Sequence, residues 1–364
     1  MSTSQTMPYA TELQIGSHRI GGDGPTYFIA DIAANHDGDL ERAKSLIHLA
    51  AQAGADAAKF QHFQAKTIVS DRGFKTLGGS QSHQASWKRS VFEVYDAAAV
   101  DIAWTQALKD TCDAAGITFF TSPYSSELVD AVDPFVPAYK IGSGDISFTA
   151  IIEHICKKKK PVLLATGASS MDDVVRAVQT ALMHNPQLAL MQCNTNYTGS
   201  LENFKFLQLN VLKCYAAMYP GMVLGLSDHT PGHASVLGAV ALGARMIEKH
   251  FTDDVTRAGP DHAFSMDAAG WREMVMRTRE LENALGDGIK KIEPNEQQTA
   301  VLQRRCLRAA TAMAKGQVVS NEHLEALRPC PSDGIAPWQI TQVLGLTLRH
   351  AVSAGDPVKW SDLR

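Results

Sequence analysis

Two histidines each end a short apolar run, and together they could hold a metal ion. His229 closes the run 223–229 and His250 closes the run 245–250, with a helix-like stretch at 232–243 between them. A strand, helix, strand unit places the C-terminal ends of its strands side by side. Both imidazoles would then point into one mouth of a parallel sheet, where a divalent metal could join them. A lone histidine more often only satisfies a neighbouring polar group, so the pairing is what favours a metal.

Two lysines lie inside otherwise apolar runs of strand type. Lys59 and Lys140 are costly to bury unless each faces an anion, although for either one alone an exposed strand end explains the position equally well. Hydroxyl side chains stand at the ends of further strand-like runs, at Ser122, Ser143, Thr166 and Ser227. The combination predicts a pocket for phosphate and carboxylate, and therefore a small dianionic substrate beside the metal.

The elements that must position these residues repeat along the chain. Between residues 26 and 285, eight cycles alternate a strand-like run with an amphipathic stretch, such as the one that follows a predicted helix cap at Asp39. The strand-like runs begin at Tyr27, Ala57, Ile117, Ala138, Val162, Leu188, Val223 and Met246. Eight cycles predict an α/β fold, a closed (β/α)8 TIM barrel. A doubly wound open sheet is the alternative, because periodicity cannot show closure.

The sequence divides into a large and a small part. We expect a barrel domain at 1–286, a charged and polar linker at 287–299 and a compact domain at 300–364, which is too short for a catalytic fold of its own. Within the barrel, the segment 65–99 is long, polar and rich in Gly, Ser and Gln. Such a segment is expected to be a lid over the mouth or an oligomer contact.

Composition excludes several classes of function. A net charge of -4 gives no broad basic field for nucleic acid or a membrane surface. The six cysteines form no Cys-x-x-Cys pair, and at least two of them fall on apparent helices as small apolar residues, as expected of reduced thiols. No apolar run reaches the roughly 18 residues of a membrane span, and the polar start lacks a signal-peptide core. These features predict a soluble cytoplasmic protein.

Several motifs resemble those of the sialic acid synthase (N-acetylneuraminate synthase-like) family. The order of Lys-Phe-Gln, Ser-Asp-His-Thr and Lys-His-Phe-Thr is highly specific, although each fragment alone would be weak. The similar segments are 32–38, 55–61, 140–144, 225–230, 248–252 and 259–261. Residues 300–364, which include Leu327-Arg-Pro329, resemble the antifreeze-protein-like (SAF) domain that ends those enzymes.

The resemblance implies an activity. Enzymes of this family condense phosphoenolpyruvate with a sugar aldehyde, N-acetylmannosamine or a related amino-hexose, and form a nonulosonic (sialic-type) acid with release of phosphate by C–O cleavage. It implies a (β/α)8 barrel followed by the SAF domain. The implied cofactor is a divalent metal held by His229 and His250, Mn²⁺ by analogy, with Mg²⁺ and Co²⁺ as alternatives. The implied assembly is a domain-swapped homodimer, in which the small domain reaches over the partner's barrel mouth.

The resemblance also assigns roles to single residues. It places Asp31, where the family commonly has Glu, near the attacking water, and Asp261 near the metal and the aldehyde. Asp145 and Tyr197 match contacts to the sugar, and Arg328 matches a contact supplied by the partner's small domain. The residues implied in binding phosphoenolpyruvate are Lys59, Gln61, Ser122, Lys140, Ser143, Thr166 and Ser227.

Some alternatives stay open at this point. The stretch 193–198 departs from the family's usual order, so the aldehyde could instead be a diamino-hexose or a phosphorylated sugar. The absence of an added Arg or Lys cluster favours an unphosphorylated one. A metal-dependent barrel hydrolase could use His229, His250 and Asp261, but it would need neither pocket lysine. A non-catalytic carbohydrate-binding protein is the third class, and it would be favoured by loss of these residues.

Overall fold

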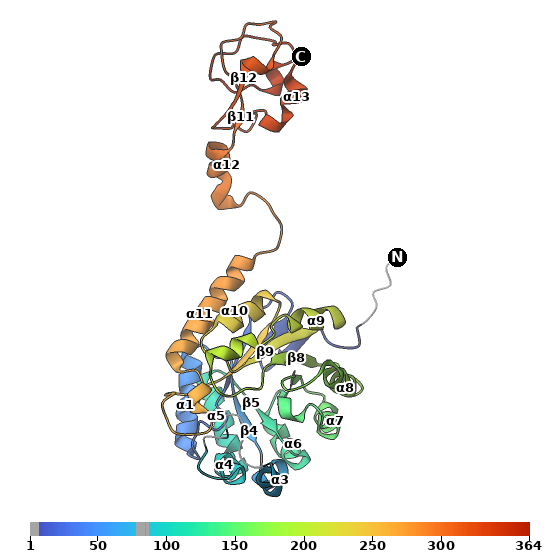
Figure 1. Ribbon diagram of the computed structural model, residues 1–364, viewed down its shortest axis with the longest axis vertical. Helices are drawn as coiled ribbons and strands as arrows, with labels where there is room; N and C mark the ends of the chain where they lie inside the picture. The colour runs from blue at the N-terminus through green and yellow to red at the C-terminus, as the bar shows by residue number, and fades with distance from the viewer. Residues whose placement is uncertain (1–6, 78–83, 85–86) are drawn as a thin grey trace. The chain divides into compact units, whose positions relative to one another are not determined.

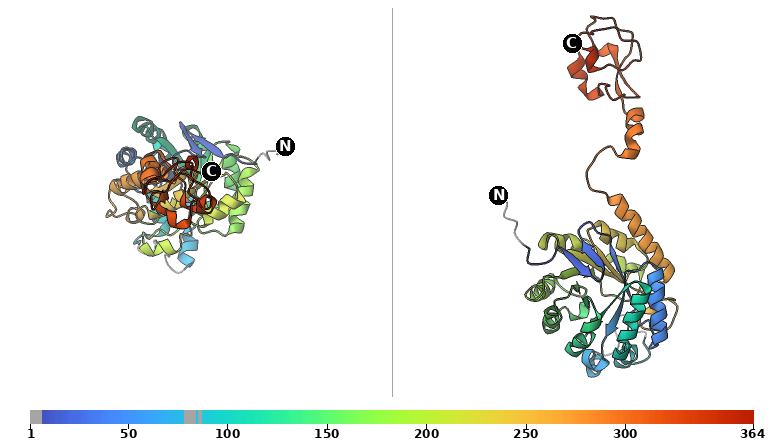
Figure 2. Two further views of the ribbon diagram at one scale, coloured as in Figure 1. Left: turned by 90° about the horizontal axis from the view of Figure 1, so that it is seen from above. Right: turned by 180° about the vertical axis from the view of Figure 1, so that it is seen from behind.

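The computed structural model describes residues 7–77, 84 and 87–364. The chain separates into two compact units, residues 1–286 and 287–364. In the first unit the helices form a layer around the strands, as the views in Figures 1 and 2 show. The predicted functional residues fall in this unit, with the exception of Arg328.

Eight parallel strands form a closed barrel in the order β10-β3-β4-β5-β6-β7-β8-β9. Their bounds are β3 (Tyr27–Asp31), β4 (Ala57–His62), β5 (Thr118–Pro123), β6 (Tyr139–Ile141), β7 (Val162–Ala165), β8 (Leu188–Cys193), β9 (Val223–Asp228) and β10 (Met246–His250). Closure comes from the pairing of β10 with β3, in which Met246 lies opposite Tyr27. The TIM barrel is therefore confirmed over the open sheet, and each predicted strand start lies within one residue of the observed one.

The outer layer consists of amphipathic helices. Their bounds are α1 (Leu40–Gln52), α5 (Thr105–Ala115), α6 (Ser126–Val132), α7 (Thr149–Lys157), α8 (Met171–Leu182), α9 (Val211–Met218), α10 (Ala234–Ala241) and α11 (Ala268–Leu285). In α1 the predicted cap is confirmed, because the Asp39 side chain accepts a hydrogen bond from the Arg42 N–H. Such a cap stabilises a helix by about 1 kcal/mol. Each helix buries one face against the barrel and thereby holds the strand that precedes it in place.

A hairpin that the sequence analysis did not predict precedes the barrel. Strands β1 (Glu12–Ile15) and β2 (His18–Gly21) pair antiparallel, and Leu13, Ile15 and Ile20 join the buried apolar core. A β-carbon at Gly21 would lie 3.1 Å from the side chain of Val223, the first residue of β9. The hairpin therefore lies at the N-terminal ends of the strands, and the opposite end of the barrel remains open for the site.

The long polar segment 65–99 is partly helical, which the sequence analysis did not predict. It contains α2 (Ala65–Ile68), α3 (Asp71–Thr76) and α4 (Val91–Ala98). Ser90 and Glu93 form a reciprocal capping box at the start of α4, a signal that the sequence pattern contained. The part richest in Gly, Ser and Gln, residues 78–83 with 85 and 86, lies outside the described residues.

The second unit has a small core of its own. Helix α12 (Gln297–Gln303) is followed by β11 (Cys306–Ala309), β12 (Leu324–Leu327) and α13 (Ile340–Val343). The buried apolar side chains include Leu307, Met313, Ile335, Leu348 and Val358. Because α12 begins at residue 297, the helix crosses the predicted end of the linker at 299. Arg328 directly follows β12 and is exposed.

Two further expectations concern the whole chain. None of the helices in the described ranges is long and apolar enough to cross a membrane. All six cysteines are free, and Cys112 and Cys156 are buried on α5 and α7. Those two fill small apolar positions, as predicted.

Candidate active site at the barrel mouth

The predicted polar residues meet at the C-terminal ends of the barrel strands. The strand register places Asp31 opposite both His250 and Lys59, and Gln61 opposite Ser122. Side chains at one level of a barrel therefore come from neighbouring strands rather than from neighbouring positions in the sequence. This is the end of a TIM barrel that carries the reacting groups in known enzymes.

Two buried lysines are paired with two buried carboxylates. Lys59 Nζ lies 2.7 Å from Asp31 Oδ2 and 3.9 Å from Glu248 Oε2. Lys140 Nζ lies 2.5 Å from Glu248 Oε1. Each of the four side chains is at most 5% exposed. The sequence analysis expected each lysine to face an anion. The protein itself supplies two such anions, the carboxylates of Asp31 and Glu248.

Glu248 is the partner that the sequence analysis missed. It lies two residues before His250 on β10, and alternate residues of a strand share a face, so the pattern could have placed it in the mouth. Ser227 Oγ also donates to Glu248 Oε1, over 3.1 Å, and Gln61 Nε2 donates to Asp31 Oδ2, over 3.0 Å. Both of these predicted residues therefore contact the charged network.

The electrostatics keep the Asp31 and Lys59 pair ionised. Burial alone would raise the pKa of Asp31, but Lys59, His250 and Lys140 outweigh it and hold that pKa below the usual range. For Lys59, burial would lower the pKa, but Asp31 and Glu248 outweigh it and raise the pKa of the ammonium. Lys59 therefore stays an ammonium group, and the N–H donors that Asp31 does not use can bind an anion.

Three buried oxygen atoms in this network lack a hydrogen-bond partner among the described residues: Asp31 Oδ1, Glu248 Oε2 and Ser122 Oγ. Buried polar atoms are rarely left without a partner in folded proteins, because desolvation then goes uncompensated. Their grouping at one place indicates a site that water or a substrate completes.

The two predicted metal histidines lie together. The ring centroids of His229 and His250 are 5.4 Å apart. His229 Nδ1 lies 3.0 Å from the carbonyl oxygen of Asn194, so Nδ1–H donates there and Nε2 keeps its lone pair. His250 Nδ1 is buried without a partner among the described residues, and burial lowers the pKa of His250 to about 3. Burial would lower the pKa of His229, but Cys193 outweighs it and raises that pKa. Once deprotonated, both imidazoles have a nitrogen that can bind a divalent metal.

The protein supplies few ligands beyond these two. Within the described ranges, no group of three or more His, Cys, Asp or Glu side chains is arranged to hold a metal. The nearest carboxylates are those of Asp31 and Asp261, at 3.6 and 3.7 Å from the ring nitrogens of His250. Burial raises the pKa of Asp261 to about 6. A metal at the two imidazoles would therefore have positions left for water and substrate oxygen.

A cavity of about 420 Å³ opens from this point. Its lining includes the predicted residues Gln61, Ser143, Asp145, Tyr197, His250 and Asp261. Tyr197 packs edge-on against His229, with the ring centroids 4.4 Å apart. Burial raises the pKa of Asp145 to about 6. The structure thus places both predicted sugar contacts of the barrel beside the two histidines.

Other predicted residues lie deeper or are already engaged. Asp31, Lys59, Ser122, Lys140 and Ser227 are buried and do not line the cavity. The hydroxyl of Thr166 donates to the carbonyl of Met191 and accepts from Tyr215, each over 3.0 Å. Thr166 is therefore less available to a ligand than the sequence suggested.

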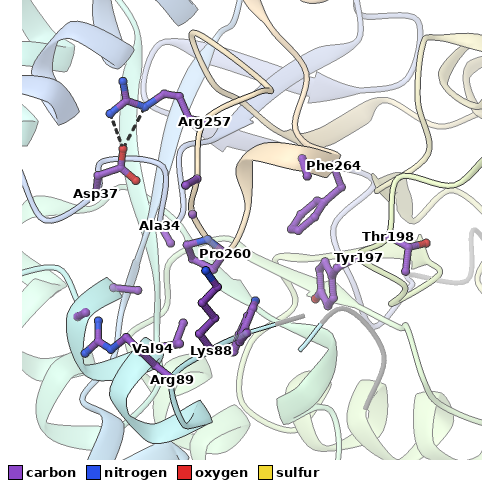
Figure 3. Close-up of a pocket in the computed structure, with 16 residues that line it drawn as sticks. Ala34, Asp37, Lys88, Arg89, Val94, Tyr197, Thr198, Arg257, Pro260 and Phe264 are labelled. Atoms are coloured by element: carbon purple, nitrogen blue, oxygen red, sulfur yellow. Dashed lines mark hydrogen bonds and ion pairs between the residues drawn. The ribbon is translucent and has the colours of Figure 1, made fainter. Parts of the chain in front are cut away.

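A second cavity, of about 1050 Å³, adjoins the first and shares Ala34, Trp87, Val94, Ala98, Tyr197 and Pro260 with it (Figure 3). Lys88 and Arg89 line it from the segment before α4, and Arg257 lines it from the far side, paired with Asp37 at 2.9 Å. The sequence showed no cluster of cations here because these residues are about 170 positions apart. Residues of the segment 65–99, among them Trp87 and Val94, therefore line both cavities. A role as a lid or as an oligomer contact stays a prediction.

Comparison with known proteins agrees with this geometry. The model of the NeuB family matches residues 46–290, and the model of the SAF domain matches residues 304–364. The chain belongs to the NeuB family. Its members are nonulosonic acid synthases that use phosphoenolpyruvate, and membership implies a metal-dependent enzyme in general. The expectations of a barrel hydrolase and of a non-catalytic binding protein thereby lose their support.

Relatives of this NeuB-family chain differ in the sugar acid that they are named for. The chain is 32% identical to an N,N'-diacetyllegionaminic acid synthase of Legionella pneumophila, over 94% of this chain and 96% of the relative. It is 32% identical to a pseudaminic acid synthase of Campylobacter jejuni, over 97% of this chain and 100% of the relative. A crystal structure of an N-acetylneuraminic acid synthetase from Leptospira borgpetersenii superposes with a TM-score of 0.70 at 26% identity, covering 79% of this chain and 94% of that one.

Proposed function

We propose that this protein joins phosphoenolpyruvate to an amino-hexose aldehyde, N-acetylmannosamine or a related sugar, and releases phosphate. The observation that carries the proposal is the meeting of two imidazoles, two buried lysines and two carboxyls, Asp31 and Asp261, at one end of the barrel. A hydrolase would need the metal alone, whereas the lysines suit an anionic second substrate.

Phosphoenolpyruvate would lie over the two lysines. An ammonium group has three N–H donors, and Lys59 uses one of them on Asp31. The others can bind the carboxylate or the phosphate of the substrate. The unpartnered hydroxyl of Ser122 can donate to the same anion, and Gln61 and Ser143 line the cavity above it. Charge-assisted hydrogen bonds of this kind are stronger than neutral ones.

His229 and His250 would hold the metal ion, and we propose Mn²⁺, with Mg²⁺ and Co²⁺ as alternatives. When bound, the ion acts as a Lewis acid on the carbonyl group of the aldehyde. The remaining chemistry belongs to the protein. Tyr197 and Asp145 orient the sugar so that its C1 faces C3 of phosphoenolpyruvate.

The carboxyls divide the proton transfers between them. As C3 of phosphoenolpyruvate bonds to the aldehyde carbon, C2 becomes electron-poor and a water adds to it. Asp31 is ionised and its Oδ1 has no partner among the described residues, so it can take the proton of that water. Asp261, with a pKa of about 6, can give a proton to the aldehyde oxygen as that becomes a hydroxyl. Collapse at C2 then expels phosphate with C–O cleavage and leaves a 2-keto acid.

The sugar and the assembly are the finer parts of the proposal. Diamino-hexoses and phosphorylated sugars remain alternatives, because relatives at similar identity are named for different sugar acids. We further propose a domain-swapped homodimer in which Arg328 of one chain contacts the sugar at the other chain's barrel. A cytoplasmic location belongs to the same proposal, since both substrates are metabolites of the cytoplasm.

The test is phosphate release from phosphoenolpyruvate with a panel of aldehydes. The panel holds N-acetylmannosamine, its 6-phosphate and a 2,4-diacetamido-hexose, each with Mn²⁺ and after treatment with a chelator. We expect one aldehyde to support turnover well above the others, and chelation to abolish it. Turnover that persists in the chelated sample, or phosphate release that ignores the aldehyde, would contradict the proposal.

A further inference from the structure

A second buried ion pair lies directly behind the two histidines. In the register of β9 with β10, Asp228 lies opposite Lys249. His229 follows the first of these residues and His250 follows the second. The Lys249 Nζ lies 2.6 Å from Asp228 Oδ2, and both side chains are at most 3% exposed. Neither residue has a part in the chemistry proposed above.

The pair faces away from the barrel mouth. Successive residues of a strand point to opposite faces, so Asp228 and Lys249 lie on the other side of their strands from the histidines. The contacts agree, because Asp228 Oδ2 accepts a hydrogen bond of 2.6 Å from Ser235 Oγ on α10. The ion pair therefore lies between the strands and the helix layer.

The same pair fixes the backbone on both sides of His229. Asp228 Oδ1 accepts hydrogen bonds from the Thr230 N–H and hydroxyl, at 3.0 and 2.9 Å. Lys249 Nζ donates to the carbonyl of Thr230 over 2.5 Å. The residues before and after His229 are thus both tied to the residue before His250. These contacts hold the segment that carries His229 to strand β10, which carries His250.

Stability alone does not account for this arrangement. A buried ion pair contributes little net free energy, and well-packed apolar residues of similar size often do as well. The pair instead fixes geometry. The Asp228 carboxylate accepts hydrogen bonds from Lys249, Thr230 and Ser235, and these three donors together hold it in one position. Groups behind metal ligands commonly tune affinity by orienting those ligands.

We infer that Asp228 and Lys249 are positioning residues that set the separation of His229 and His250 and so the affinity for the metal. The inference rests on the proposed function, since it requires that the two imidazoles bind a divalent ion. It assigns the pair an effect on metal affinity and none on the binding of phosphoenolpyruvate, whose predicted contacts lie on the opposite face of the strands.

The test compares two double variants of the full-length protein, and each variant replaces one ion pair by uncharged residues. Asp228→Asn with Lys249→Met removes the pair behind the histidines. Asp133→Asn with Lys160→Met is the control, and it removes a partly exposed pair, 2.9 Å apart, whose residues precede β6 and β7 at the other end of the barrel. Mn²⁺ affinity is measured by calorimetric titration, unfolding temperature by scanning calorimetry, and turnover at low and high Mn²⁺.

We expect the first double variant to bind Mn²⁺ at least about tenfold more weakly, with turnover recovered by excess Mn²⁺ and KM for phosphoenolpyruvate unchanged. The control should bind Mn²⁺ as the parent does. If the first variant fails to fold, Ser235→Ala keeps the ion pair, removes one donor and should weaken Mn²⁺ binding about threefold. Three results would overturn the inference. They are an Mn²⁺ affinity equal to the parent's in the folded first variant, an equal loss of Mn²⁺ affinity in the control, and turnover of the first variant that excess Mn²⁺ does not recover. A parent that binds no Mn²⁺ would instead contradict the proposed function.

Discussion

Lys59 shows how one residue can be both a structural and a binding group. Its ammonium neutralises Asp31 over 2.7 Å in a place that water hardly reaches. The N–H donors that Asp31 does not use are available to an anion in the mouth. Removing the ammonium therefore has two consequences, one for the binding of phosphoenolpyruvate and one for the stability of the fold, and an experiment has to separate them.

We predict that Lys59→Met raises KM for phosphoenolpyruvate about 30-fold, which corresponds to about 2 kcal/mol. KM for the aldehyde should stay within about twofold. The unfolding temperature should fall as well, because Asp31 is left buried without its partner. Lys109→Met is the control, since it removes a half-buried lysine paired with Asp113 on α5, far from the proposed substrates. An unchanged KM for phosphoenolpyruvate in folded Lys59→Met protein would place Lys59 outside the binding site.

The pKa of Asp145 gives a pH dependence with a definite sign. Because burial raises this pKa to about 6, the carboxyl gains a proton as the pH falls through 6, and it then loses its charge and part of its capacity to accept hydrogen bonds from the sugar. KM for the aldehyde should therefore rise between pH 7.5 and 5.5. In Asp145→Asn it should be high already at pH 7.5 and change little. Equal pH profiles of the aldehyde KM in parent and variant would show that Asp145 does not contact the sugar.

At the level of single residues, the sequence predicts well which side chains lie together. It predicts less well which of them pair with one another. Alternation and strand ends bring His229, His250, Lys59 and Asp31 to one mouth. Alternation from His250 also puts Glu248 on the face of the mouth, but its pairing with Lys140 cannot be predicted until the partner strands are known. Which donor binds which acceptor depends on register, and register is a property of two strands.

At the level of elements, the turn after β7 illustrates how closely the mouth is packed. Gly167 donates its N–H to Ser143 Oγ over 3.0 Å. A β-carbon at this position would lie 1.8 Å from Thr195 Oγ1 and 2.8 Å from Ser143 Oγ. Only glycine fits here without displacing Ser143, which is a predicted substrate contact, and Thr195, which lines the cavity.

Gly167→Ala is therefore expected to raise KM for phosphoenolpyruvate about tenfold, because forced shifts of this kind cost about 1–3 kcal/mol. Gly144→Ala is the control, since a β-carbon there would meet no atom within 4 Å. Steady-state kinetics of the two variants at saturating aldehyde make the comparison. A Gly167→Ala enzyme with the parent's kinetics would show that Ser143 and Thr195 can move without loss.

The strands and helices of the barrel follow from the sequence almost completely. Buried parallel strands such as β9 and β10 form continuous apolar runs, and the amphipathic helices alternate with them. The hairpin β1 and β2 is missed because it pairs only with itself and is four residues long in each strand. Helix α4 is missed because the polar composition around it masks a Ser90 and Glu93 capping box.

At the level of the whole molecule, the proposed exchange of small domains predicts complementation. A chain with Arg328→Ala lacks the sugar contact but keeps its barrel, and a chain with His250→Ala lacks the metal site but keeps its small domain. Each homodimer should be nearly inactive. A mixed dimer should recover activity, because one of its sites combines an intact barrel with an intact partner domain. Mixtures that form heterodimers and stay inactive would place Arg328 in its own chain's site or in none.

The central claim is that this barrel mouth joins two substrates and breaks the C–O bond of phosphoenolpyruvate. Phosphoenolpyruvate labelled with oxygen-18 at the bridging oxygen tests it directly, in the presence of Mn²⁺ and the aldehyde that the panel selects. We predict that the label appears in the phosphate, and that each phosphate released is matched by one molecule of a 2-keto acid that contains all carbons of both substrates. Phosphate without the label, or phosphate released without that product, would contradict the account.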